Sequence, residues 1–95
     1  MKIELEIEED DYTWEENSYV KVEQPSKVLM EIQANKEGLI SLSKQLLSLA
    51  YSTDSNFYIH HWAEIKGDAN RGYFYGDLEE GSFQLSIVKV DKKGR

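Results

Sequence analysis

The sequence predicts a small α+β protein in which one central helix packs on one face of a two-layer, mostly antiparallel sheet of about five strands (β-β-β-α-β-β). Several short segments alternate apolar and polar residues, which is typical of strands with one buried face. One segment near the middle of the chain instead repeats its apolar residues with helical spacing. The 95 residues have room for one core, so residues 1–95 are expected to form a single domain.

Three strands are expected before the helix. Residues 2–8 alternate isoleucine and leucine with charged side chains, and this is the cleanest strand pattern in the chain. Residues 18–23 follow a polar connection as the second strand, which Pro25 is expected to close because proline cannot donate to a ladder. Residues 27–34 repeat the alternation and form the third strand.

The helix is expected from Lys36 to about Tyr51. Asn35 is the expected N-cap, and Glu37 places a carboxylate near the positive end of the helix dipole. The expected apolar stripe contains Leu39, Leu42, Leu46, Leu49 and Ala50. The polar side of the helix carries Ser41, Ser43, Lys44, Gln45 and Ser48.

Two longer strands follow the helix, at residues 57–65 and 83–90, and residues 73–75 could add a short one. A single helix covers only one face of such a sheet, so the other face meets water or a partner.

If the helix covers the Ile59 side, Tyr58, His60 and Trp62 project from the open face of the sheet. These rings either belong to a protein interface or pack among themselves as a satellite cluster.

The charge of the chain is uneven. The net charge is −7, and residues 1–31 hold ten acidic residues against three lysines. An acidic surface repels phosphate and anionic lipid, which disfavours direct binding of nucleic acid or membrane and favours a basic protein partner. Residues 8–16 combine six carboxylates with Tyr12 and Trp14, and they are either a docking segment or a solvated acidic loop.

No residue pattern names a catalytic reaction, a cofactor or a metal. The chain has no cysteine, and His60 and His61 are neighbours on a strand, so their side chains point to opposite faces and cannot chelate one metal together. The acids Asp77, Glu79 and Glu80 surround a turn at Gly81 and are best explained as solvated turn residues. The early acidic residues argue against a signal peptide, and together with the absence of cysteine they favour a cytoplasmic protein. The lack of any site with assignable catalytic roles disfavours an enzyme.

The order of features from Ile32 to Val90 resembles a family of bacterial immunity proteins encoded beside polymorphic toxins, immunity protein 32. The residues that carry the resemblance are Ala34-Asn35, Lys36-Glu37-Gly38-Leu39, the helix segment 42–50, Ile59-His60-His61, Leu78-Glu79-Glu80-Gly81-Ser82 and Leu85-Ser86-Ile87-Val88.

The resemblance implies a non-enzymatic protein that binds and neutralises a cognate toxin domain, such as a basic nuclease, as a monomer or a homodimer. The alternative is a small intracellular regulatory or adaptor domain that acts by self-association. The expected partner-binding residues are Asp10, Asp11, Tyr12, Trp14, Glu15, Glu16, Tyr58, His60 and Trp62.

Overall fold

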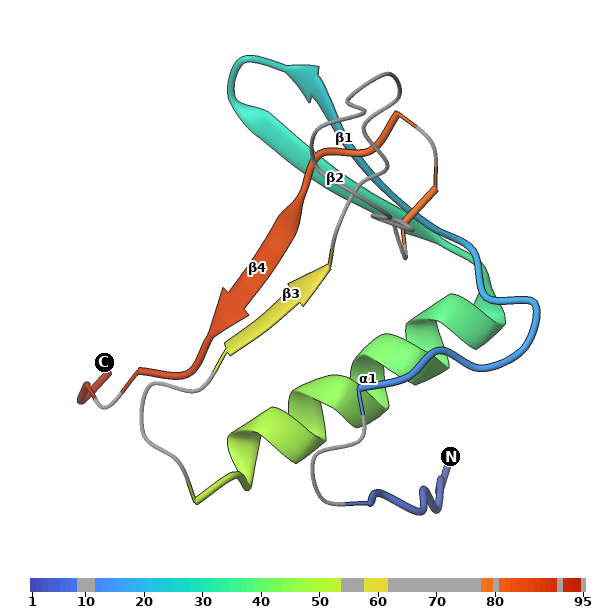
Figure 1. Cartoon of the computed structure of the whole chain (residues 1–95), viewed down its shortest axis with the longest axis vertical. Helices are drawn as coiled ribbons and strands as arrows, with labels where there is room; N and C mark the ends of the chain where they lie inside the picture. The colour runs from blue at the N-terminus through green and yellow to red at the C-terminus, as the bar shows by residue number, and fades with distance from the viewer. Residues whose placement is uncertain (9–11, 54–57, 62–77, 80, 91, 95) are drawn as a thin grey trace, which may run out of the picture.

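The computed structural model describes residues 1–8, 12–53, 58–61, 78–79, 81–90 and 92–94 (Figure 1). The elements in chain order are β1 (Val20–Ser26), β2 (Leu29–Ala34), α1 (Lys36–Ala50), β3 (Tyr58–His61) and β4 (Leu85–Val88). The α+β class with one helix is confirmed. The described strands form two small antiparallel sheets, β1-β2 and β3-β4, in place of the expected single sheet of about five strands.

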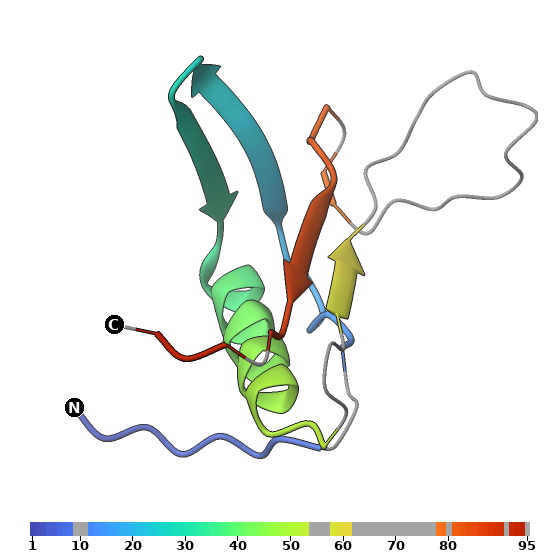
Figure 2. The same cartoon turned by 90° about the vertical axis from the view of Figure 1, so that its left-hand side faces the viewer.

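The two sheets are joined by the segment that precedes β4. The backbone N–H of Glu79 donates to the carbonyl of Val20 at 2.8 Å, and that of Phe83 donates to the carbonyl of Val22 at 2.9 Å. In return, the N–H of Val22 donates to Ser82 Oγ at 3.1 Å. The order in space is therefore β2, β1, residues 79–83 leading into β4, and then β3 (Figure 2).

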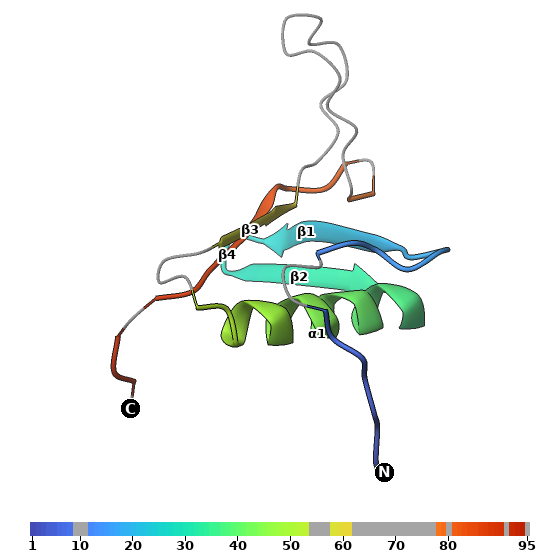
Figure 3. The same ribbon diagram turned by 60° about the horizontal axis from the view of Figure 1, so that its bottom comes forward.

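Helix α1 lies along one side of the strands (Figure 3). The core cluster contains Val20, Val22, Leu42 and Leu78, with Trp14, Ala34 and Leu85 packed against it. Further buried side chains from α1 and β3 are Leu49, Ile59 and His61.

The prediction of a strand at residues 2–8 is wrong. Residues 1–8 are described throughout and form no strand, and their side chains are exposed, with Ile3 at 64%. A strand needs a neighbour that offers free N–H and C=O groups. β1 is closed to residues 2–8, because β2 pairs with one of its edges and Glu79 and Phe83 bond to the other. The end of the N-terminal segment lies instead against α1, where Ser48 Oγ donates to the carbonyl of Glu8.

The end of β1 also differs from the prediction. β1 continues through Pro25 to Ser26, and its register with β2 shifts between Glu23 and Ser26. A proline is tolerated at such an irregularity because the missing N–H is not needed for the ladder. The expected strand at residues 73–75 and the end of the strand expected at 57–65 lie outside the described residues.

The start of α1 matches the sequence prediction. Asn35 Oδ1 accepts hydrogen bonds from the N–H of Gly38 at 2.8 Å and of Tyr19 at 3.0 Å. Its Nδ2 donates to the carbonyl of Asn17 at 2.8 Å. Asn35 therefore caps the helix and also ties its first turn to the chain that enters β1.

Candidate protein-binding surface

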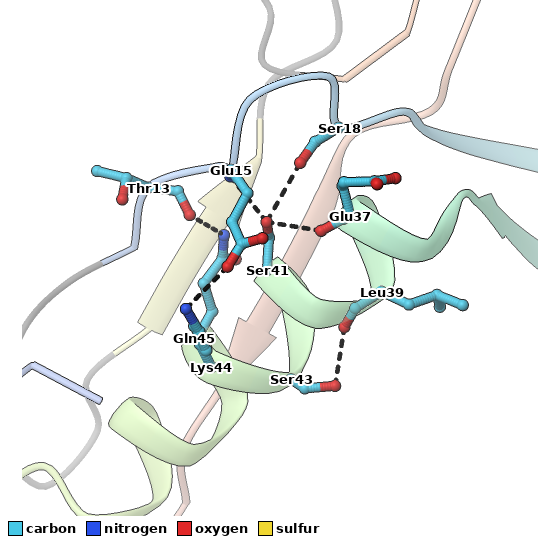
Figure 4. Close-up of polar contacts among 9 residues, drawn as sticks. All are labelled: Thr13, Glu15, Ser18, Glu37, Leu39, Ser41, Ser43, Lys44 and Gln45. Carbon is cyan, nitrogen blue, oxygen red and sulfur yellow. Dashed lines mark hydrogen bonds and ion pairs between the residues drawn. The ribbon is translucent and has the colours of Figure 1, made fainter. Parts of the chain in front are cut away.

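Residues 8–16 form the acidic segment, of which the structure describes Glu8 and residues 12–16. This segment is fastened to the middle of α1 by Ser41, which is 1% exposed (Figure 4). Ser41 Oγ donates to the carbonyl of Glu37 at 2.8 Å and accepts from the N–H of Glu15 at 2.9 Å. It also lies 3.2 Å from Ser18 Oγ, which must donate because the single hydroxyl proton of Ser41 is already used. One small hydroxyl thus holds the backbone of Glu15 and the side chain of Ser18 against the helix.

A second attachment links Glu15 to the helix through charge. Lys44 Nζ lies 2.8 Å from Glu15 Oε1, and both side chains are about one-third exposed. The carboxylate of Glu15 is consequently held toward α1. A pair this exposed contributes at most about 1 kcal/mol, so it orients the segment more than it stabilises the fold.

The third attachment is buried and reaches β3. Gln45 Nε2 donates to the carbonyl of Thr13 at 3.1 Å, and Gln45 Oε1 is hydrogen-bonded to His61 Nε2. An amide oxygen only accepts, so His61 Nε2 carries the proton. The ring of His61 also contacts that of Trp14, with centroids 4.5 Å apart. The acidic segment is therefore positioned by both α1 and β3.

The two histidines lie on opposite faces of β3, as predicted. His61 is buried on the core side with Ile59, whereas Tyr58 is 59% exposed on the other face. His60, on the same face as Tyr58, lies with its Nε2 2.8 Å from Gln84 Oε1. Tyr58 and His60 therefore share the face of β3 opposite Ile59, where Tyr58 is exposed and His60 is half-buried. Within the described ranges, no three histidine or acidic side chains gather in a way that could hold a metal.

A cavity of about 210 Å³ lies between the acidic segment, the N-terminal residues and α1. Its lining is Glu6, Ile7, Glu8, Thr13, Trp14, Glu15, Ser41 and Lys44. Ser48 Oγ donates to the carbonyl of Glu8 at 3.3 Å and so holds the end of the N-terminal segment against the helix. With three carboxylates and one ammonium group around it, the cavity is anionic.

The predicted partner-binding residues lie in two separate places. Residues 12–16 lie on the side of β3 that carries His61, and Tyr58 and His60 lie on the opposite face of the strand. Trp14 packs against the core, the Tyr12 hydroxyl is buried, and Glu15 is bound to Lys44. Glu16 and Tyr58 are exposed. Asp10, Asp11 and Trp62 lie outside the described residues.

Sequence reasoning missed the role of Ser41, Gln45 and Ser48. They were assigned to the polar side of the helix, yet all three are buried, while Leu39 and Leu46 of the expected apolar stripe are exposed. The spacing of these three polar residues, four and then three apart, places them on one helical face. That spacing could have predicted a row of polar side chains on α1 that faces the acidic segment.

The structure is that of a small α+β protein with an anionic surface beside α1. The chain belongs to the immunity protein 32 family, whose model matches residues 30–90. The matched region begins in β2 and includes all of α1, β3 and β4, whereas the acidic segment precedes it. No curated protein and no solved structure matches the chain. In the part of the chain that the structure describes, no helix has the length and apolar character needed to cross a membrane.

Proposed function

We propose that this protein binds a cognate toxin domain and neutralises it without catalysing a reaction. The observation that carries the proposal is the family match over residues 30–90, because an immunity protein acts on a protein toxin. The protein acts in the cytoplasm, where a toxin that enters or is made in the cell meets its substrate.

The charge distribution supports a basic toxin, such as a nuclease. Nucleases bind phosphate through basic surfaces, and an anionic protein steers toward such a surface and competes with the nucleic acid. Glu6, Glu8 and Glu16 are exposed near the attachment of the acidic segment to α1. Their carboxylates are available to pair with arginine or lysine side chains of the toxin.

The proposed toxin-binding surface comprises the acidic segment and the outer face of β3. Tyr58 is the exposed aromatic anchor, and Trp14 and Glu15 hold the segment in place through His61 and Lys44. A standard interface takes about 800 Å² from each partner. That is roughly a tenth of the 7848 Å² surface of this chain.

The test is co-expression of the protein with the toxin domain encoded by the adjacent gene, with cell growth and binding of the purified proteins as readouts. Full protection and a complex of defined stoichiometry are expected. Normal toxicity in the presence of the folded protein, together with no binding, would overturn the proposal.

Variants then locate the surface. Glu16→Lys, Trp14→Ala and Trp62→Ala are expected to weaken toxin binding at least tenfold. Glu31→Lys is the matched control for Glu16→Lys, since Glu31 is also exposed but lies on β2, away from the acidic segment. Equal affinity for Glu16→Lys and Glu31→Lys would remove the acidic segment from the interface.

A further inference from the structure

Among the described residues, nothing pairs with the outer edge of β2 in the β1-β2 hairpin. β1 is hydrogen-bonded on both sides, to β2 and to residues 79–83, whereas β2 pairs only with β1 among the described residues. The hairpin extends away from α1 (Figure 1), and every β2 residue except Ala34 is exposed. The open edge of β2 thus combines free backbone groups with exposed apolar side chains, among them Met30 and Ile32.

The six residues of β2 include no proline and no lysine, and Glu31 is their one charged side chain. Proteins block such edges with proline, an inward lysine or a bulge. In this hairpin Pro25 and the register shift both belong to β1, the inner strand, and the nearest lysines, Lys27 and Lys36, lie beyond the ends of β2. The proline and the register shift thus belong to β1, which is already paired on both sides. Among the described residues, the edge of β2 remains available for pairing.

The sequence of β2 is complementary to itself in one antiparallel register. Val20 pairs with Ala34 and Val22 with Ile32, so Met30, Ile32 and Ala34 share the face that carries the core. A two-fold axis at Ile32 sets Ile32 opposite its copy and Met30 opposite Ala34 on that face. On the other face, it sets Glu31 opposite Gln33, whose amide donates to Glu23 and Glu31 of its own chain.

Competing registers are less favourable. An axis at Glu31 brings two carboxylates directly together, which is destabilising. An axis at Met30 leaves three β2 residues in the pairing, in place of the five that pair about Ile32. A register shifted by a single residue would bring apolar side chains opposite polar ones.

We infer that β2 forms the interface of a symmetric homodimer by pairing antiparallel with β2 of a second copy, with the axis at Ile32. This pairing joins the β1-β2 sheets of the two copies into one sheet. It also places Met30, Ile32 and Ala34 of both copies side by side on one face. A six-residue strand is about 20 Å long and provides less than a standard interface, so the expected dissociation constant is on the order of 10 µM.

This inference is independent of the proposed function. β2 and β3 lie at opposite ends of the strand order, so a dimer formed through β2 leaves the acidic segment and Tyr58 accessible. Each copy in the dimer can bind its own toxin domain, and loss of the dimer leaves toxin binding by the single chain intact.

Sedimentation equilibrium of the full chain tests the inference. At concentrations from about one-tenth to twenty times the expected dissociation constant, the mass should rise from 11.0 kDa toward twice that value. Ile32→Lys places two ammonium groups at the axis and should weaken the dimer at least tenfold. Val88→Lys is the matched control, because Val88 on β4 is 52% exposed and Ile32 is 47% exposed. A monomer across the whole range, or equal loss in both variants, overturns the inference.

The absence of cysteine allows a sharper test of the register. Opposite residues of an antiparallel pair have Cα atoms about 4.5 to 5.5 Å apart, which a disulfide can bridge. Under mild oxidation Ile32→Cys should therefore crosslink to a dimer, whereas Met30→Cys and Val88→Cys should not. Circular dichroism checks that each variant is folded. Equal crosslinking of all three variants contradicts the proposed axis.

Discussion

Gln45 on α1 and His61 on β3 share a hydrogen bond in the protein interior, where they are only 1% and 2% exposed. The amide of Gln45 also donates to the carbonyl of Thr13, so this one side chain links the helix, a strand and the acidic segment. Each of these groups is satisfied because all three segments are correctly placed.

Gln45→Leu is expected to lower the free energy of unfolding by about 2 to 4 kcal/mol, because it leaves the N–H of His61 and the carbonyl of Thr13 buried without this partner. Urea unfolding followed by tryptophan fluorescence measures the change. Ser43→Ala is the control, since Ser43 is exposed and bonds only within the helix, to the carbonyl of Leu39. A loss for Gln45→Leu no larger than for the control would show that the bridge contributes nothing to stability.

Gly38→Ala should destabilise the protein although alanine favours helices. A Cβ at Gly38 would collide with the carbonyl oxygen of Tyr19 and lie 2.9 Å from Val20 Cγ2. Relieving that overlap requires β1 to move relative to α1, at an expected cost of about 1 to 3 kcal/mol. Thermal unfolding should show a lower Tm for Gly38→Ala and no change for Gly94→Ala, where a Cβ meets nothing within 4 Å.

Asn35→Ala removes the helix cap and the link to Asn17 together. The cap alone contributes about 1 kcal/mol, and the bonds to the N–H of Tyr19 and the carbonyl of Asn17 add to it. A loss of about 1 to 3 kcal/mol in urea unfolding is expected. Asn35→Ser retains an N-cap oxygen and should recover part of the loss. No difference between the two variants would indicate that capping is not the origin of the effect.

Lys89 is expected to stabilise the end of α1. Its ammonium group donates to the carbonyls of Ala50 at 3.1 Å and Ser52 at 2.7 Å, near the negative end of the helix dipole. Lys89→Met should cost about 1 kcal/mol and speed amide hydrogen exchange in the last turn. Lys92→Met changes the net charge equally and serves as the control. Unchanged exchange in the last turn of Lys89→Met would contradict the assignment.

Salt is expected to weaken the contribution of the Glu15–Lys44 ion pair to stability but not that of the hydrogen bond from Glu15 to Ser41. Lys44→Met breaks the partly exposed ion pair and should cost at most about 1 kcal/mol at low ionic strength, with the difference shrinking in 1 M salt because the charges are screened. Ser41→Ala removes bonds to the backbone of Glu15 and to Ser18, and its cost should persist in salt. The stability of each variant relative to the parent protein at both ionic strengths measures this difference.

The sequence was sufficient to predict the helix, its cap at Asn35 and the opposite orientations of His60 and His61. These features follow from local chemistry and periodicity, which the chain carries in a few neighbouring residues. The strand predicted at residues 2–8 failed for a different reason. The position of that segment depends on distant parts of the chain: Glu79 and Phe83 bond to the second edge of β1, and Ser48 of α1 holds the carbonyl of Glu8.

The buried face of α1 could not be chosen from hydrophobicity alone. Ser41 and Gln45 enter the interior because backbone groups of Glu15 and Thr13 need hydrogen-bond partners there, and those needs appear only once the acidic segment lies across the helix. The position of Trp14 was equally hidden from the sequence. Its ring packs against that of His61 on the core side of β3, so it does not share a surface with Tyr58.

The hydrogen bonds that Glu79 and Phe83 donate to Val20 and Val22 join residues about sixty positions apart in the sequence. During translation, β1 emerges from the ribosome long before these donors are made. A chain with such distant contacts completes this part of its fold only after residue 83 has been made. A fragment that stops before residue 79 would lack these donors, and premature termination or proteolysis near the C-terminus would therefore affect the first strand of the protein.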